Sequence, residues 1–143
     1  MTFATFAPSK TTTQRALAIL RIVSAFLLLQ HATAKLFGFP HVAFFDNLQV
    51  LSLHGVAGII ELVGGLLLLV GLYARPVAFV LSGELAFAYF IGHAPRGNVL
   101  SPMLNGGESA VLFCFVFLYL SAAGAGTWSL DARRVMPGAV RAA

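Results

Sequence analysis

The chain has 143 residues, of which 59% are hydrophobic and only 10% are charged, and its formal net charge is +4. Soluble domains carry about 25% charged residues, so this composition excludes an ordinary soluble domain and indicates a protein of the lipid bilayer. The length suits one compact unit. The single cysteine, Cys114, excludes an intramolecular disulfide and a paired-cysteine redox motif.

Four apolar segments follow one another along the chain, each close to the ~20 residues that cross a ~30 Å hydrocarbon core. They are Ala16 to Phe37, Leu53 to Tyr73, Pro76 to His93 and Gly106 to Ala123. The connections contain Pro, Gly, Asn or Asp, which end helices and form turns. Backbone groups in lipid must bond within their own segment, so the sequence predicts an all-α, polytopic membrane protein with a bundle of four transmembrane helices.

The basic residues lie unevenly around these segments. Six basic residues are expected on the side of the membrane that holds the termini: Lys10, Arg15, Arg75, Arg133, Arg134 and Arg141. Two are expected on the opposite side, Lys35 and Arg96. By the positive-inside rule, residues 1–15 and 124–143 are expected to be short cytoplasmic tails of a single membrane domain, residues 1–143. Basic flanks suit a membrane surface, so the net charge predicts no nucleic-acid partner.

A signal peptide is the alternative interpretation of the first segment. Basic residues, the run LAILRIVSAFLLL and then ATA resemble a cleavable leader. However, Arg21 interrupts the apolar run, and the sequence KLFGF follows at once without a soluble domain. We therefore expect this segment to remain as the first span.

Polar and small residues recur at helical spacing on the first two segments. One seam is Arg21, Ser24, Leu28, His31 and Lys35, and the other is His54, Gly58, Glu61 and Gly65. Small residues let membrane helices pack closely, so we expect the seams to meet. Because a charge that faces lipid is costly, Lys35 and the imidazoles should neutralise or hydrogen-bond Glu61 and Glu108.

With about 1.5 Å of rise per helical residue, most of the unusual polar residues fall in the half of the bundle away from the termini. The candidate ligand-binding residues are His31, Lys35, His54, Glu61, Glu84, His93, Asn105 and Glu108. An intramembrane carboxylate such as Glu61 or Glu84 is a functional candidate by default, although an acid hydrogen-bonded between helices is the structural alternative. Whether Glu84 joins this outer cluster or faces a neighbouring subunit stays open.

Several of these residues also have interpretations that need no ligand. Arg21 and Lys35 could snorkel to the membrane interfaces, and His54 and His93 could be interfacial residues. The stretch GAGTWSLDARR is typical of a helix exit, with Trp128 suited to the interfacial aromatic belt. We interpret this stretch as one that fixes the orientation of the chain in the membrane, not as part of a catalytic or binding site.

Imidazole is a common ligand of metals and haem, and His31, His54 and His93 could lie at overlapping depth. The sequence has no HExxH motif, no paired cysteines and no two histidines one turn apart on one helix. It therefore predicts no metal site and disfavours haem.

Three pieces of the chain, in order, resemble the DoxX family of small bacterial membrane proteins. The pieces are Arg21 with the later HATAKLFGF, ELVGGLLLLVGLYARPVA, and AYFIGHAPRG with LNGGESAVLFCFVFLYLSAAGAGTWSLD. The resemblance implies a four-helix integral protein of the bacterial cytoplasmic (inner) membrane. Relatives are linked to quinol oxidase, to thiosulfate:quinone oxidoreduction or to thiol redox defence, and fold kinship alone leaves the function open.

Two classes of function follow. In the first, the protein is an accessory component of a quinone-linked redox system, with His31 or Lys35 donating to a quinone carbonyl and Glu61 or Glu108 carrying the proton. The chain shows no redox centre of its own, so a partner subunit would deliver the electrons, and catalysis by the chain alone is not expected.

The second class is a non-enzymatic membrane assembly or lipid-binding protein, in which the polar residues hold the helices together. A small proton or solute transporter is a weaker third possibility, because no inverted repeat or broken helix is visible. A homo-oligomer remains open.

Overall fold

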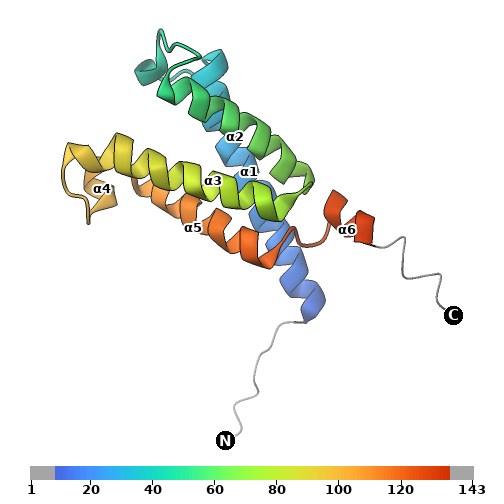
Figure 1. Cartoon of the computed structure of the whole chain (residues 1–143). Coiled ribbons are helices and arrows are strands. Elements are labelled where there is room, and N and C mark those ends of the chain that lie inside the picture. Colours follow the sequence, from blue (N-terminus) through green and yellow to red (C-terminus); the bar gives the residue numbers. More distant parts are fainter. Residues whose placement is uncertain (1–8, 136–143) are drawn as a thin grey trace, which may run out of the picture.

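The computed structural model describes residues 9–135, and every regular element in that range is helical. The long helices are α1 (Lys10–Phe37), α2 (Leu53–Val70), α3 (Ala74–Ala88) and α5 (Glu108–Ala123) (Figure 1). A π-helix (Tyr89–His93) and a 3₁₀ turn (Ala94–Arg96) extend α3. The shorter elements are a 3₁₀ turn (Ala43–Phe45), α4 (Pro102–Asn105) and α6 (Leu130–Val135).

Local capping explains where the first two helices begin and end. The Ser9 side chain accepts from the Thr12 amide at the start of α1, and Ser52 accepts from the Gly55 amide at the start of α2. Gly38 and Gly71 follow the two helices in the left-handed conformation, with φ of 67° and 68°, which glycine adopts without a steric penalty.

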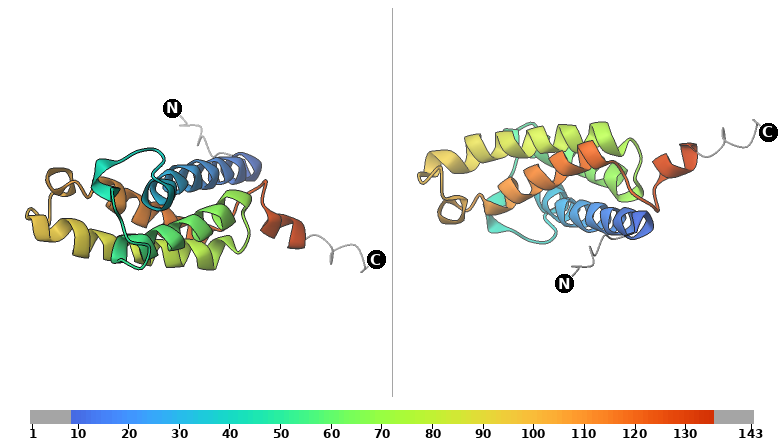
Figure 2. Two further views of the ribbon diagram at one scale, coloured as in Figure 1. Left: turned by 90° about the horizontal axis from the view of Figure 1, so that it is seen from above. Right: turned by 90° about the horizontal axis from the view of Figure 1, so that it is seen from below.

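The long helices form two hairpins, α1 with α2 and α3 with α5. In Figure 1 the hairpins cross at one end and diverge toward the other. We call the converging end, formed by residues 71–73 and 124–129, the closed end, and the diverging end, formed by residues 38–52 and 97–107, the open end. Seen from below in Figure 2, α5 lies between α3 and α1.

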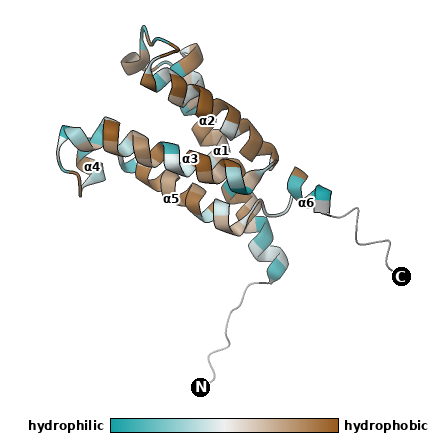
Figure 3. Ribbon diagram, viewed as in Figure 1, coloured by the Kyte–Doolittle hydropathy of each residue, from teal (hydrophilic) through white to brown (hydrophobic). Residues whose placement is uncertain are grey.

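Three helical segments are long and apolar enough to cross a membrane: α1, α2 and residues 74–96. The fourth predicted span, 106–123, is a shorter apolar helix of 16 residues, α5. Its length is about 24 Å at the usual rise, against a hydrocarbon core of ~30 Å. Figure 3 shows apolar residues along all four long helices and polar residues at the start of α1 and on α6.

Several predicted boundaries differ from the structure. Helix α1 starts at Lys10 rather than Ala16, because the Ser9 cap begins the helix within a polar stretch. Helix α2 ends at Val70 rather than Tyr73, because Gly71 terminates it. Residues 124–131, predicted as part of a tail, instead help to form the closed end, where Asp131 bonds Gly71 and Ser129 is buried.

Candidate functional site

A cavity of about 950 Å³ lies between the two hairpins at the open end, and we call it the interhairpin pocket. Its lining comes from α1, residues 38–52, α2, the extended α3 and the start of α5. Most of the lining is apolar, which is typical of small-molecule sites. Its charged and imidazole side chains are His31, Lys35, His54, Glu61, Glu84, His93 and Arg96.

An ion pair joins α1 to α2 in the wall of the pocket. The Lys35 ammonium donates to both carboxylate oxygens of Glu61, at 2.6 and 2.7 Å. Only 11% and 3% of the two side chains are exposed. Gly58 permits this approach, because a Cβ there would lie 3.1 Å from the Lys35 Cβ. The seams therefore meet as predicted, and Lys35 is paired rather than snorkelling to an interface.

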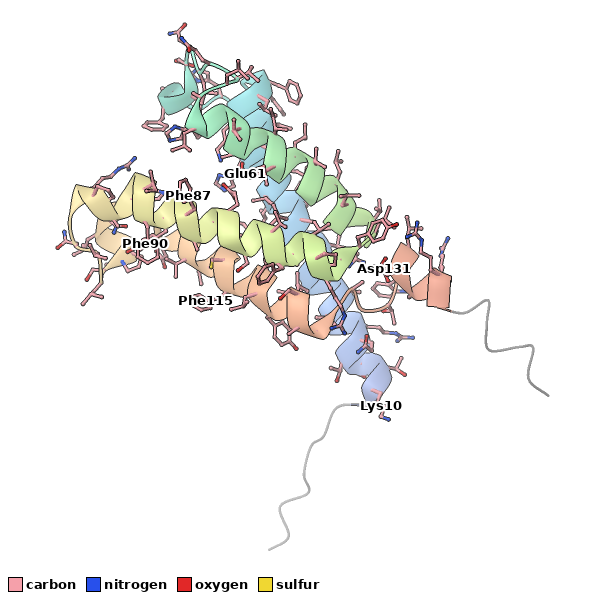
Figure 4. All side chains as sticks on the ribbon, viewed as in Figure 1. Lys10, Glu61, Phe87, Phe90, Phe115 and Asp131 are labelled. Carbon is pink, nitrogen blue, oxygen red and sulfur yellow. The ribbon has the colours of Figure 1, made fainter. Side chains whose placement is uncertain are left out.

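Glu84 enters the same pocket from α3. Its Oε2 atom is buried, and within the described part of the chain it has no hydrogen-bond partner. Burying an unpartnered polar oxygen is costly, so native proteins rarely leave one without protein, water or ligand. Figure 4 shows Glu61 on the side of α2 that faces α3, so carboxyl groups from both hairpins face one space.

Three histidines line the pocket at different places. The His31 ring on α1 meets Phe113 of α5 edge to face, with 6.0 Å between centroids, which links the two hairpins. The His54 ring, at the start of α2, packs against Phe44, with 5.5 Å between centroids. His93 lies at the end of the π-helix, a distortion often found at functional sites.

Asn105 is placed beside the pocket rather than in its lining. Its side-chain amide donates to the Tyr89 hydroxyl at 3.1 Å and its oxygen accepts from the Gly107 amide at 2.9 Å. The Tyr89 hydroxyl in turn donates to the Val99 carbonyl. Asn105 is itself buried, so its visible role is to hold the connection between α3 and α5.

Glu108 is exposed in the first turn of α5 and does not line the pocket. The prediction that Lys35 and the imidazoles would neutralise or hydrogen-bond Glu61 and Glu108 is confirmed for Lys35 with Glu61. It is wrong for Glu108, whose carboxylate has no such partner among residues 9–135. An acidic residue at this position interacts favourably with the positive end of the helix dipole. Because Glu108 is also exposed, its charge is stable without a basic partner among the described residues.

The connection over residues 38–52 supplies part of the pocket wall, a contribution that the sequence analysis missed. Phe44 and Phe45 line the cavity. The Arg96 guanidinium from the other hairpin lies 5.9 Å from the centre of the Phe44 ring, and the Lys35 ammonium lies 5.9 Å from that of Phe45. Two adjacent aromatic residues in a short connection were the available signal.

Arg21 lies outside the pocket, at the closed end, where its side chain is fully buried. It donates to the carbonyls of Leu68, Leu69, Ala125 and Trp128. The alternative that Arg21 snorkels to the interface is therefore wrong, because backbone carbonyls of α2 and of residues 125–128 satisfy its guanidinium within the bundle.

Asp131 completes the closed end. Its carboxylate accepts from the amides of Tyr73 and Ala74 at 2.9 and 2.8 Å, which caps the first turn of α3. Figure 4 shows Asp131 near the connection between α2 and α3. Within residues 9–135, no group of three or more His, Cys, Asp or Glu residues is arranged to hold a metal ion.

The DoxX family model matches residues 16–94, more than half of the chain. The chain belongs to the DoxX family. The matched range contains Lys35, Glu61 and Glu84 of the pocket. Together with its apolar helices, this membership identifies a multi-pass membrane protein.

This DoxX family protein is also similar to a protein of Haemophilus influenzae (strain ATCC 51907 / DSM 11121 / KW20 / Rd) that is described as uncharacterized. The two are 47% identical over 117 residues, which cover 80% of this chain and 87% of the relative. No solved structure matches the chain.

Proposed function

We propose that this DoxX family protein binds a quinone in the interhairpin pocket and acts as an accessory component of a quinone-linked redox system. The observation that carries the proposal is the unpartnered, buried Glu84 oxygen in a largely apolar pocket that also holds the Lys35–Glu61 pair. A quinone has an apolar ring that bears two carbonyl oxygens. A pocket with apolar walls and a few fixed polar groups is suited to bind such a ring.

The pocket offers hydrogen-bond partners for both redox forms of such a ring. Two of the three N–H donors of Lys35 bond Glu61, and the third, which has no acceptor among the described residues, can donate to a quinone carbonyl. The Glu84 oxygen is suited to accept from a hydroxyl of the reduced ring, the quinol. His31 lies in the same lining and can donate or accept according to its tautomer.

In this proposal the whole chain, residues 1–143, acts as one domain of the bacterial cytoplasmic membrane with both termini in the cytoplasm. The basic residues Arg75, Arg133 and Arg134 lie toward the closed end, which supports a cytoplasmic position for that end. The open end and its pocket then face outward. A partner subunit exchanges electrons with the quinone, because the sequence has a single cysteine and residues 9–135 hold no cluster suited to a metal ion.

The test is mass spectrometry of an organic extract of the purified, folded protein, scored for quinone per polypeptide. The variants are Glu84→Gln and the charge-neutral pair Lys35→Met with Glu61→Gln, and Glu108→Gln is the matched control outside the pocket. We expect near-stoichiometric quinone in the wild type and the control. We expect at least about a tenfold loss, of the order that one charged hydrogen bond contributes, in both pocket variants.

Background lipid alone in all four proteins would overturn the quinone site. Stoichiometric phospholipid in the wild type that is lost in the pocket variants would instead favour the lipid-binding alternative. Gel filtration and helical circular dichroism of each variant separate loss of ligand from loss of fold.

A further inference from the structure

A second cavity, of about 400 Å³, lies between α2 and α3 on the side of the pocket nearer the closed end. We call it the α2–α3 groove. Its walls include Ile60, Val63 and Leu67 from α2 and Val77, Val80 and Leu81 from α3. All of its lining residues are apolar or glycine. Val63 and Val80 are 54% and 57% exposed, so the groove opens onto the surface that lipid covers.

The groove and the interhairpin pocket adjoin each other along the same pair of helices. Ile60 lines both cavities, and the next residue, Glu61, belongs to the polar pocket. On α3 the groove ends at Leu81, and the pocket begins three residues later at Glu84. The apolar groove therefore ends where the carboxyl groups begin.

We propose that the α2–α3 groove holds the apolar prenyl or alkyl tail of the ligand whose polar ring lies in the interhairpin pocket. This inference rests on the proposed function, because it assigns the second part of the same ligand. Ile60 to Leu67 spans about 10 Å of helix, so the groove takes the part of the tail nearest the ring. The remainder of the tail lies in the lipid.

The gain in affinity from the groove comes from close packing. Lipid tails are as apolar as the groove, so transfer of the ligand tail between them provides little hydrophobic driving force. Dispersion contacts between the ligand tail and side chains held in place on two helices should make the binding free energy modestly more favourable. We therefore expect the tail to strengthen binding by about tenfold, which corresponds to ~1.4 kcal/mol.

The experiment measures binding of two probes to the full-length protein in nanodiscs, with probe concentration expressed per lipid. One probe is the ubiquinone ring without a tail, and the other is the same ring with a decyl tail. Val80→Trp fills the groove from an exposed position. Val23→Trp, on the lipid-facing side of α1 at 49% exposure and outside both cavities, is the matched control.

In the wild type we expect the tailed probe to bind about tenfold more tightly than the tail-less ring. In Val80→Trp the tailed probe should fall to the affinity of the tail-less ring, whose own affinity should stay unchanged. Equal affinities of both probes in the wild type, or the same loss in Val23→Trp, would overturn the groove assignment and leave the quinone site standing. Failure of both probes to bind would overturn the proposed function and this inference with it.

Discussion

At the closed end, the guanidinium of Arg21 donates to four backbone carbonyls, whereas at the open end a buried oxygen of Glu84 has no partner in the described part of the chain. The closed end also has the Asp131 cap on α3, and the open end has the interhairpin pocket. Polar groups whose hydrogen bonds are satisfied by other elements join helices. A buried polar group without a hydrogen-bond partner, placed in a cavity, is available to a ligand. The polar groups of Arg21 and Asp131 at the closed end are satisfied by the protein itself, whereas at the open end the Glu84 oxygen is left for the ligand that we propose.

The largest effect should follow removal of the Arg21 side chain. Arg21→Met leaves the carbonyls of Leu68, Leu69, Ala125 and Trp128 without this donor, and we expect a loss of roughly 4 kcal/mol in the free energy of unfolding. Arg21→Lys should lose less, because an ammonium keeps the charge without the planar fork. Denaturation in mixed micelles measures both, and an Arg21→Met protein as stable as the wild type would refute the stabilising role of the closed end.

The next largest loss of stability should follow substitution of one member of the Lys35–Glu61 ion pair at the open end. Glu61→Gln leaves the nearly buried Lys35 ammonium without its carboxylate, so we expect a loss of about 3 kcal/mol. The double variant with Lys35→Met should recover most of this loss, because no unpaired charge remains. The same unfolding assay tests the pair as a double-mutant cycle, and simple additivity of the two substitutions would show that the pair has no coupling.

A smaller loss is expected from the helix cap. Asp131→Ala removes the acceptor for the Tyr73 and Ala74 amides at the start of α3, and such caps contribute about 1 to 2 kcal/mol. Asp131→Asn retains an acceptor oxygen and should lose less than half as much. Thermal unfolding of the two variants beside the wild type measures the difference, and equal losses would indicate that charge, not capping, is the contribution of Asp131.

The smallest change in stability should come from Glu84→Gln. Its buried oxygen has no partner to lose within residues 9–135, so we expect the free energy of unfolding to stay within about 0.5 kcal/mol of the wild type. The quinone content should nevertheless fall, as proposed above. A strong loss of stability in the purified protein, stripped of ligand, would mean that Glu84 is a structural residue like Arg21, and the contrast between the two ends would fail.

The sequence predicted the elements that depend on local pattern. Hydropathy located the long helices, since apolar runs of this length satisfy their own backbone only as helices. Helical spacing brought Lys35 and Glu61 together, because residues three and four apart share one face of a helix. The shorter length of α5 was missed, since the predicted span began at Gly106, which belongs to the turn after α4, whereas α5 begins at Glu108.

The contacts that depend on the angle between hairpins were beyond the sequence. Spacing along α3 gives the face of Glu84 but not whether α2 lies opposite that face. The partners of Arg21 could not be predicted either. Its acceptors are backbone carbonyls, which every residue has, so the sequence does not show which of them bind the guanidinium. The aromatic lining from Phe44 and Phe45 was missed because it depends on how residues 38–52 return across the pocket.

The hydrogen bonds of Arg21 join positions 104 and 107 residues apart, at Ala125 and Trp128. During synthesis, α1 therefore enters the membrane with a guanidinium whose last acceptors have not yet been made. Until residues 125–128 leave the ribosome, that charge must be solvated by water, by lipid headgroups or by the insertion machinery. Assembly of the bundle is consequently completed by residues near its C-terminal end. In a chain truncated before Ala125, the Arg21 guanidinium of α1 would lack two of its four acceptors, and proteases that degrade misassembled membrane proteins should recognise such a chain.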